Sequence, residues 1–451
     1  MKKLTEGNIW KNFILFAIPL VLSGLLSQAY TTIDTVIAGH YLGEEGLAAI
    51  GATSSFLTFV INLFAGYLVG FAMYVARLFG EGAYERIQRA VWVHFLVSTV
   101  ASLVVAVAAL FFTDPLLRML NVPQGTAFWQ DAKTYFQIYM IGLAMFNFGT
   151  NCIYVLGGLG DSAFTFYMSL LSSVLNIAGN ILTVTVLGMG VAGIAWSSVF
   201  SASVVAVFFI LRFKSNFKKL LPNGGKIKWS FKENKEALPY SIPPILQQAA
   251  MYVSGVLLSP VVNSLGEAAI ASYVVSMQIM GLSNTMYYNA SRTVSNYTAQ
   301  CLGSPFERDE MRRRLKRGIG VGLVQSTALT LLLLIPCVIF PQFTASIFFE
   351  RGSAEESIAM TVFFQRVFLP FSVFNIVNNL FHGVFRAVKA KGLLISSTVF
   401  SSAIRIAVSY PLTAKYGLDG FWAGMVIAWI AEALVLGVIY RMDLWMPKEI
   451  R

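Results

Sequence analysis

Apolar runs of about 20 residues or more recur from one end of the chain to the other, separated by shorter polar stretches. Each run is long enough to cross a hydrocarbon core of about 30 Å as an α-helix. Strands of a membrane barrel would instead alternate apolar and polar residues over about 10 positions, and these runs do not. The pattern predicts an all-α integral membrane protein with twelve transmembrane helices. We place them at residues 10–38, 46–76, 90–112, 131–157, 164–187, 190–211, 236–263, 268–300, 318–340, 357–385, 393–414 and 420–440.

Composition supports this class. The 451 residues are 56% hydrophobic and only 12% charged, whereas soluble domains carry about 25% charged residues. Cys152, Cys301 and Cys337 lie in or beside apolar runs without paired spacing. We therefore expect them to be packing residues, with neither a disulfide framework nor a metal site.

The net charge of +11 and basic runs such as RRRLKR at 312–317 could suggest a nucleic-acid partner. The distribution of charge favours the positive-inside rule instead. Of the 33 Lys and Arg residues, 26 fall on the side that holds both termini, four on the opposite side and three within spans. This bias predicts cytoplasmic termini in a plasma-membrane protein without a nucleic-acid partner.

The two halves of the chain repeat each other. A basic polar linker at residues 214–235 divides an N-terminal six-helix lobe, residues 1–213, from a C-terminal one, residues 236–451. The stretch at 18–51 returns in shortened form at 242–272. Because each half has an even number of spans, the repeat is parallel, with its pseudo-twofold axis along the membrane normal. This pattern predicts two pseudo-symmetric lobes around a central cavity, the architecture of alternating access.

Three features are distinctive: PLVLSGLLSQAYTTIDTVIAGHYLGEEGLAAIG at 19–51, VLGGLGDSAFTFYMSLLSSVLNIAGNILTV at 155–184, and the Gly-rich turns at 188–196 and 416–424. Together with the twelve spans in two sixes, they resemble the multidrug and toxic compound extrusion (MATE) transporters. The resemblance covers essentially the whole chain. It implies a V-shaped pair of helical lobes that exports organic, often cationic, compounds against inward H+ or Na+. It implies no cofactor beyond that coupling ion.

The resemblance also places a functional acid in the first helix, which Asp34 matches. Many members carry N-x-x-x-D in the fifth helix, but here Asn176 is followed by Asn180, so the aspartate is replaced. One branch has a further acid early in the seventh helix, where this chain has Met251. Asp34 is therefore the principal candidate for ion coupling.

Asp34 has two interpretations. An acid inside an apolar span is costly to bury and commonly functional, but Asp34 lies near the end of its span and could form local hydrogen bonds only. Asn176 and Asn180 lie one helical turn apart and could bind Na+ with Asp34 or simply hydrogen-bond between helices. Tyr135 and Asn151, with Asn147 between them, could complete this ion-coupling site or hold the lobe together.

The second half carries buried charge of the opposite sign. Arg292, Arg366 and Arg405 lie within spans, with His382 near the end of one and Glu432 midway along another. Such arginines are expensive unless they pair, face water or meet a ligand. Glu432 could pair with one of them. The alternative is that this lobe presents positive charge to an anionic or zwitterionic substrate.

Spans one, two, seven and eight are rich in Met, Phe and Tyr, so Met251 and Met277 could line a flexible substrate cavity or serve ordinary helix packing. We predict a monomeric antiporter for small organic molecules. The alternative is a flippase for a lipid-linked or anionic amphiphilic substrate. An enzyme is disfavoured because the three His residues are scattered and no paired-carboxylate motif, metal-ligand cluster or nucleotide loop is present.

Overall fold

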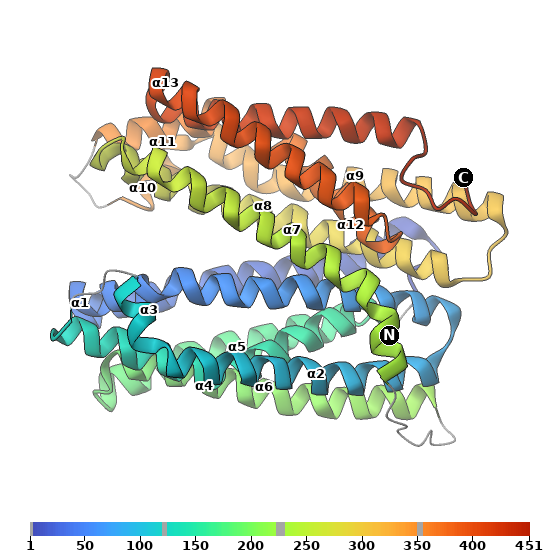
Figure 1. Cartoon of the computed structure of the whole chain (residues 1–451), viewed down its shortest axis with the longest axis horizontal. Coiled ribbons are helices and arrows are strands. Elements are labelled where there is room, and N and C mark those ends of the chain that lie inside the picture. Colours follow the sequence, from blue (N-terminus) through green and yellow to red (C-terminus); the bar gives the residue numbers. More distant parts are fainter. Residues whose placement is uncertain (1–2, 120–123, 222–230, 350–354) are drawn as a thin grey trace. The chain divides into compact units, whose positions relative to one another are not determined.

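The computed structural model describes residues 3–119, 124–221, 231–349 and 355–451, and the regular elements in these ranges are all helices (Figure 1). Helix formation follows from the apolar sequence, because a helix satisfies every backbone hydrogen bond within its own segment. The elements are α1 (Ile9–Glu81), α2 (Tyr84–Phe111), α3 (Thr113–Met119), α4 (Ala127–Gly158), α5 (Ser162–Ile181), η1 (Leu182–Val186), α6 (Gly190–Leu220), α7 (Phe231–Asn263), α8 (Glu267–Gly303), α9 (Arg308–Ile339), α10 (Pro341–Ser346), α11 (Glu355–Val367), η2 (Leu369–Phe371), α12 (Ser372–Ala387) and α13 (Lys391–Arg441).

Two of these helices are each broken once by a glycine. Gly43 in α1 has φ 69° and Gly417 in α13 has φ 60°, values that glycine adopts without steric cost. The break in α1 separates a span at Ile9–Gly43 from one at Ala49–Glu81. The two glycines lie between the spans predicted at 10–38 and 46–76 and between those predicted at 393–414 and 420–440.

The remaining spans confirm the twelve-helix prediction. Within the described ranges, nine helices are long and apolar enough to cross a membrane, with the broken α13 counted once. A tenth is formed by α11 with η2 and α12, which are bent by 40° next to Pro370, whose ring lacks a backbone N–H. The two parts of α13 on either side of Gly417 supply an eleventh when they are counted separately. The twelfth is α8, which is long enough but lacks a stretch as apolar as those of the nine. Its residues Ser291–Cys301 are all buried, so protein rather than lipid surrounds its polar side chains.

The chain divides into two compact units. Unit 1 contains Leu22–Ser241, and unit 2 contains Leu4–Val21 together with Ile242–Arg451. The divisions fall inside α1 and α7, close to Pro19 and Pro243. The start of α1 therefore belongs to unit 2, and the start of α7 belongs to unit 1. The lobe boundaries at 213 and 236 stay a prediction.

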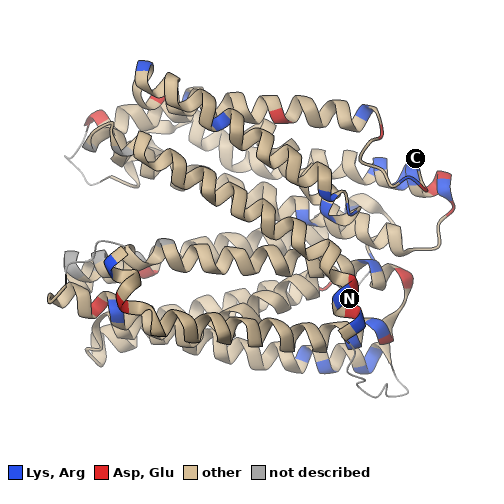
Figure 2. Ribbon diagram, viewed as in Figure 1, with Lys and Arg blue, Asp and Glu red and all other residues tan. Residues whose placement is uncertain are grey.

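Each unit is apolar outside and partly polar inside. On α2, Leu96, Val100 and Val107 are exposed, whereas Ser98 and Ser102 are fully buried. This is the reverse of a soluble helix and suits a lipid solvent. Charged residues gather near helix ends, and few lie in the helix middles (Figure 2). The charged residues that lie in the helix middles are the candidates for a functional site.

Candidate functional site

Asp34 is hydrogen-bonded into the interior of unit 1. Asn180 donates from Nδ2 to Asp34 Oδ1 over 2.5 Å and lies 3.4 Å from Asn176 Oδ1. Asn176 in turn donates to Ser198 Oγ over 2.9 Å. Both asparagines are buried, while Asp34 is partly exposed. One polar chain therefore joins α1, α5 and α6 and ends at a carboxylate that is still accessible.

The local structure of α5 explains this placement. Residues four apart share one face of a helix, so Asn176 and Asn180 both point toward α6 and Asp34. Directly after Asn180 the helix widens into the π-helical η1, Leu182–Val186. Short π-helical insertions are frequently found at functional sites. Thr183 and Ser197 contact each other at 3.1 Å beside this widening and extend the polar contact between α5 and α6.

Tyrosines surround the carboxylate. Tyr135 and Tyr139 lie on α4 with ring centroids 4.7 Å apart, and Tyr139 donates to Ser198 Oγ over 3.2 Å. The hydroxyls of Tyr30, Tyr135 and Tyr139 are all within electrostatic reach of Asp34. Tyr30 and Tyr139 were not predicted. A spacing signal for both exists, since Tyr30 precedes Asp34, and Tyr139 follows Tyr135, by one helical turn.

Asn151 is not part of this group. Its Nδ2 donates to Ser98 Oγ over 2.9 Å, and Asn147 donates to Ser102 Oγ over 3.2 Å. Along α4, Asn151 lies about 24 Å from Tyr135 at 1.5 Å per residue. These two asparagines join α4 to α2, so the structure brings together Asp34, Asn176, Asn180 and Tyr135 but not Asn151.

In unit 2 the buried acid pairs with a histidine. His382 Nε2 lies 2.9 Å from Glu432 Oε1 and 3.3 Å from Ser397 Oγ. His382 and Glu432 are 8% and 4% exposed. The alternative in which Glu432 forms its ion pair with an arginine is therefore not what the structure shows.

Two of the three predicted arginines donate hydrogen bonds to neutral side chains. Arg405 donates from Nε to Ser254 Oγ over 3.1 Å, and its Nη2 donates to the same oxygen. Arg292, which is 6% exposed, donates to Asn289 Oδ1 over 3.2 Å. Arg366 is exposed and lines a separate hollow of about 420 Å³ with Glu355.

The two predicted methionines differ in their surroundings. Met251 is 48% exposed, whereas Met277 packs against the hydrophobic core of unit 2 that contains Trp422. Their role in a substrate cavity stays a prediction.

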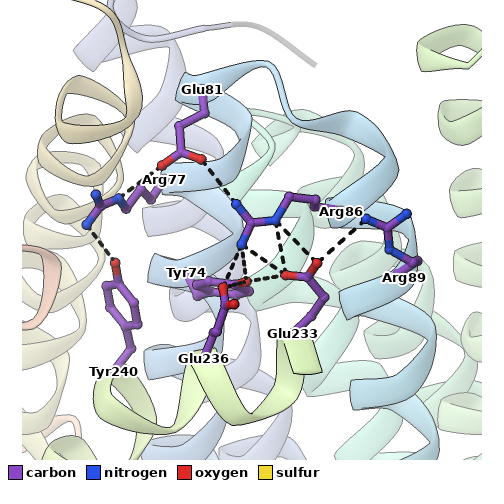
Figure 3. A network of polar contacts seen from close by, with 8 residues as sticks. All are labelled: Tyr74, Arg77, Glu81, Arg86, Arg89, Glu233, Glu236 and Tyr240. Atoms are coloured by element: carbon purple, nitrogen blue, oxygen red, sulfur yellow. Dashed lines mark hydrogen bonds and ion pairs between the residues drawn. The ribbon is translucent and has the colours of Figure 1, made fainter. Parts of the chain in front are cut away.

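A network of charged residues at one end of unit 1 was missed by the sequence analysis (Figure 3). Arg86 contacts Glu233 at 3.2 Å, Glu236 at 2.6 Å and Glu81 at 3.7 Å. Glu233 also accepts a hydrogen bond from Tyr74. The remaining members are Arg77, Arg89 and Tyr240.

This network fastens the start of α7 to α1 and α2. Arg86 lies on α2, Tyr74 on α1, and both Glu233 and Glu236 on α7. Glu233 is only 4% exposed, so its charge depends on these partners. The network thus explains why the start of α7 groups with unit 1.

Comparison with known proteins identifies the family. A family model described as MatE matches residues 19–182 and 243–411, more than half of the chain. The chain belongs to the MATE family of transporters. It is therefore a multi-pass membrane transporter and not an enzyme, and the resemblance seen in its sequence is confirmed.

Similar MATE proteins match along almost their whole length. The probable multidrug resistance protein YoeA of Bacillus subtilis is 24% identical, covering 100% of this chain and 97% of the relative. The multidrug export protein MepA of Staphylococcus haemolyticus is 23% identical, covering 97% and 94%.

Solved structures share the fold, with twelve helices in two lobes. A multidrug resistance MATE transporter in an outward-facing conformation gives a TM-score of 0.86 at 20% identity, covering 99% of both chains. A MOP superfamily transporter from Pyrococcus furiosus gives a TM-score of 0.88 at 21% identity, covering 99% of this chain and 100% of that one. For the latter, a binding pocket of reverse polarity is described as suggesting a different function.

Proposed function

We propose that this MATE protein exports small organic compounds by alternating access in exchange for inward-moving protons, with Asp34 as the coupling acid. The curated relatives are named for multidrug resistance or multidrug export, which supports this substrate class. The positive-inside bias supports insertion in the plasma membrane with both termini in the cytoplasm. We infer that the transporter works as a monomer within the bilayer.

The observation that carries the proposal is the hydrogen bond between Asp34 and Asn180. The Asp34 carboxylate sits in an apolar span and is held by a neutral amide donor on α5. Protonation removes the charge and weakens a charge-assisted hydrogen bond, which is about twice as strong as a neutral one. The strength of the hydrogen bond between α5 and α1 therefore depends on whether Asp34 is protonated. A proton can in this way shift an equilibrium between two conformations of the transporter.

The donor arrangement favours a proton over Na+. A hard cation needs several oxygen ligands, but Asn180 turns its NH2 group toward Asp34 and Asn176. A single carboxylate with an amide donor can hold a proton without further ligands.

The experiment is efflux of a cationic dye from proteoliposomes under a proton gradient or a sodium gradient, imposed separately. We expect the proton gradient to drive dye efflux by the wild type. Asp34→Asn should still bind the dye, but its gradient-driven efflux rate should be at least about tenfold lower. Asp419→Asn, an exposed acid in unit 2, is the control and keeps the wild-type rate. Full proton-driven transport by Asp34→Asn would overturn the coupling role, and a response to sodium alone would replace H+ by Na+.

A further inference from the structure

We propose that Arg405, with Ser254 and Tyr273, forms a binding site in unit 2 for an anionic group of the transported substrate. This inference rests on the proposed export function and specifies the substrate class. The class comprises amphiphiles that combine an apolar or aromatic body with a carboxylate or phosphate, zwitterions included.

The first observation is how Arg405 is held. It lies in the first half of α13, within a membrane span, and both of its hydrogen bonds go to the one oxygen of Ser254 on α7. Ser254 is 1% exposed, whereas the arginine side chain is partly exposed. A hydroxyl satisfies two donors but neutralises no charge. In the described structure Nη1 of Arg405 has no hydrogen bond, so the guanidinium can still donate to a ligand.

The second observation is the balance of charge around this arginine. The nearby acid, Glu432, is within electrostatic reach of Arg405, but its hydrogen bond goes to His382.

The guanidinium of Arg405 is thus hydrogen-bonded to a hydroxyl, while the carboxylate of Glu432 is hydrogen-bonded to His382. Coulomb forces are strong where water is excluded. A guanidinium whose partner is a hydroxyl attracts an anion and repels a cation. The candidate site of unit 1 has the opposite character, since it is built on the carboxylate of Asp34.

An apolar wall lies beside the charge. The Tyr273 ring stacks on Trp422 with centroids 5.6 Å apart and meets Phe421 edge-on at 5.4 Å. Tyr273 is partly exposed and within electrostatic reach of Arg405. A ligand can place an anionic group on the guanidinium and an aromatic or apolar body against this wall, as most small-molecule sites do.

A purely structural role for Arg405 makes a different prediction. If the side chain only fastened α13 to α7 through Ser254, a glutamine could donate the same kind of hydrogen bond without a charge. Substrate selectivity would then not change when the charge is removed. Arg405→Gln therefore separates the two roles, and Arg405→Lys keeps the charge while changing the shape of the donor.

The test uses a rhodamine ethyl ester, which is cationic, and the corresponding free acid, which is zwitterionic. Equilibrium binding to purified transporter is followed by fluorescence anisotropy, and gradient-driven efflux is measured in phosphatidylcholine proteoliposomes. We expect Arg405→Gln to weaken binding of the acid by about 10- to 100-fold, the range for a lost hydrogen bond to a charged group. The ester should bind unchanged, and Arg405→Lys should lie within about threefold of wild type.

Arg313→Gln, which removes an exposed arginine of α9 outside the proposed site, is the matched control and should alter neither dye. Equal changes for acid and ester in Arg405→Gln would overturn the proposal, as would binding of the ester alone by the wild type. If Arg405→Gln does not fold, Ser254→Ala removes the neutral partner and keeps the charge. That variant should retain the preference for the acid, and loss of the preference would count against the site.

A second experiment tests whether the anionic group belongs to a lipid headgroup or to a soluble organic anion. A short-chain fluorescent phosphatidylglycerol replaces the free acid, with phosphatidylcholine of the same chain length as the neutral-headgroup control. If Arg405→Gln reduces translocation of the lipid but not of the dye, the site binds a lipid headgroup. If it reduces translocation of the dye but not of the lipid, the site binds a soluble organic anion. Because anisotropy needs no gradient, failure of the coupling mechanism leaves the binding result readable.

Discussion

Glu233→Gln tests whether the network at the end of unit 1 contributes to stability. The carboxylate is 4% exposed and accepts hydrogen bonds from Arg86 Nε at 3.2 and 3.3 Å and from Arg86 Nη2 at 3.2 Å. Tyr74 donates to the same group. Glutamine has nearly the same shape but removes the charge and turns one acceptor into a donor that faces other donors.

The expected cost lies between two limits. Breaking a buried ion pair from one side costs about 3–5 kcal/mol, whereas an exposed pair contributes about 0–1 kcal/mol. The Arg86 side chain is 36% exposed and keeps Glu236 at 2.6 Å and Glu81 at 3.7 Å. Solvent screening and the remaining acids reduce the loss, so we expect Glu233→Gln to lower the free energy of unfolding by about 1–2 kcal/mol.

The assay is reversible unfolding of the detergent-solubilised protein. Glu85→Gln is the matched control, because that side chain is 71% exposed and lies 3.7 Å from Arg89, one turn along α2. Its expected cost is below about 0.5 kcal/mol. A double-mutant cycle with Arg86→Gln should show that the two losses are not additive. Equal effects of Glu233→Gln and Glu85→Gln would refute the assigned role.

Two further predictions concern other contacts within single units. Gly70→Ala would place a Cβ atom 2.3 Å from the carbonyl oxygen of Tyr240 and should cost about 1–3 kcal/mol in thermal unfolding, so an unchanged melting temperature would contradict this close approach. In unit 2, burial by itself raises the pKa of Asp443, but the hydrogen bonds and charges of Lys316 and Arg312 outweigh it and hold the pKa below its usual value. The contribution of Asp443 is therefore complete above the unfolded pKa of about 3.9 and is lost as the pH falls through the lower folded pKa. Unfolding of wild type and Asp443→Asn should differ at neutral pH and converge in acid, and a pH-independent difference would contradict this.

The fold could be predicted from sequence because membrane spans follow from length and apolarity alone. The breaks at Gly43 and Gly417 also fall between predicted spans, since polar residues surround both glycines. The bend beside Pro370 and the exchange of helix starts between the units could not be predicted. Both features depend on which residues pack together. The hydrophobic pattern of the sequence is the same whether a helix is straight or bent, and whichever unit its first residues pack against.

The site was predictable only where its members show a local spacing. Asn176 and Asn180 stand out because they are one turn apart, and Asp34 because it is an acid in an apolar run. Glu233 gave no such signal. Its partner Arg86 is 147 positions away, and charged residues at a helix end fit the positive-inside rule equally well without any partner.

The division of α1 between the two units gives the proposed coupling a physical route. Phe13 and Leu20 of α1 are fully buried in a hydrophobic core of unit 2, whereas Asp34 is bound to α5 of unit 1. Loss of the Asp34 charge weakens the hold of unit 1 on the helix but leaves the contacts of Phe13 and Leu20 unchanged. Any resulting change in α1 is absorbed most readily in the stretch between Leu20 and Asp34, which follows Pro19, a residue without a backbone N–H. In the proposed mechanism, a proton bound at Asp34 therefore acts on a helix whose start is packed in the core of unit 2, and no second acid is required.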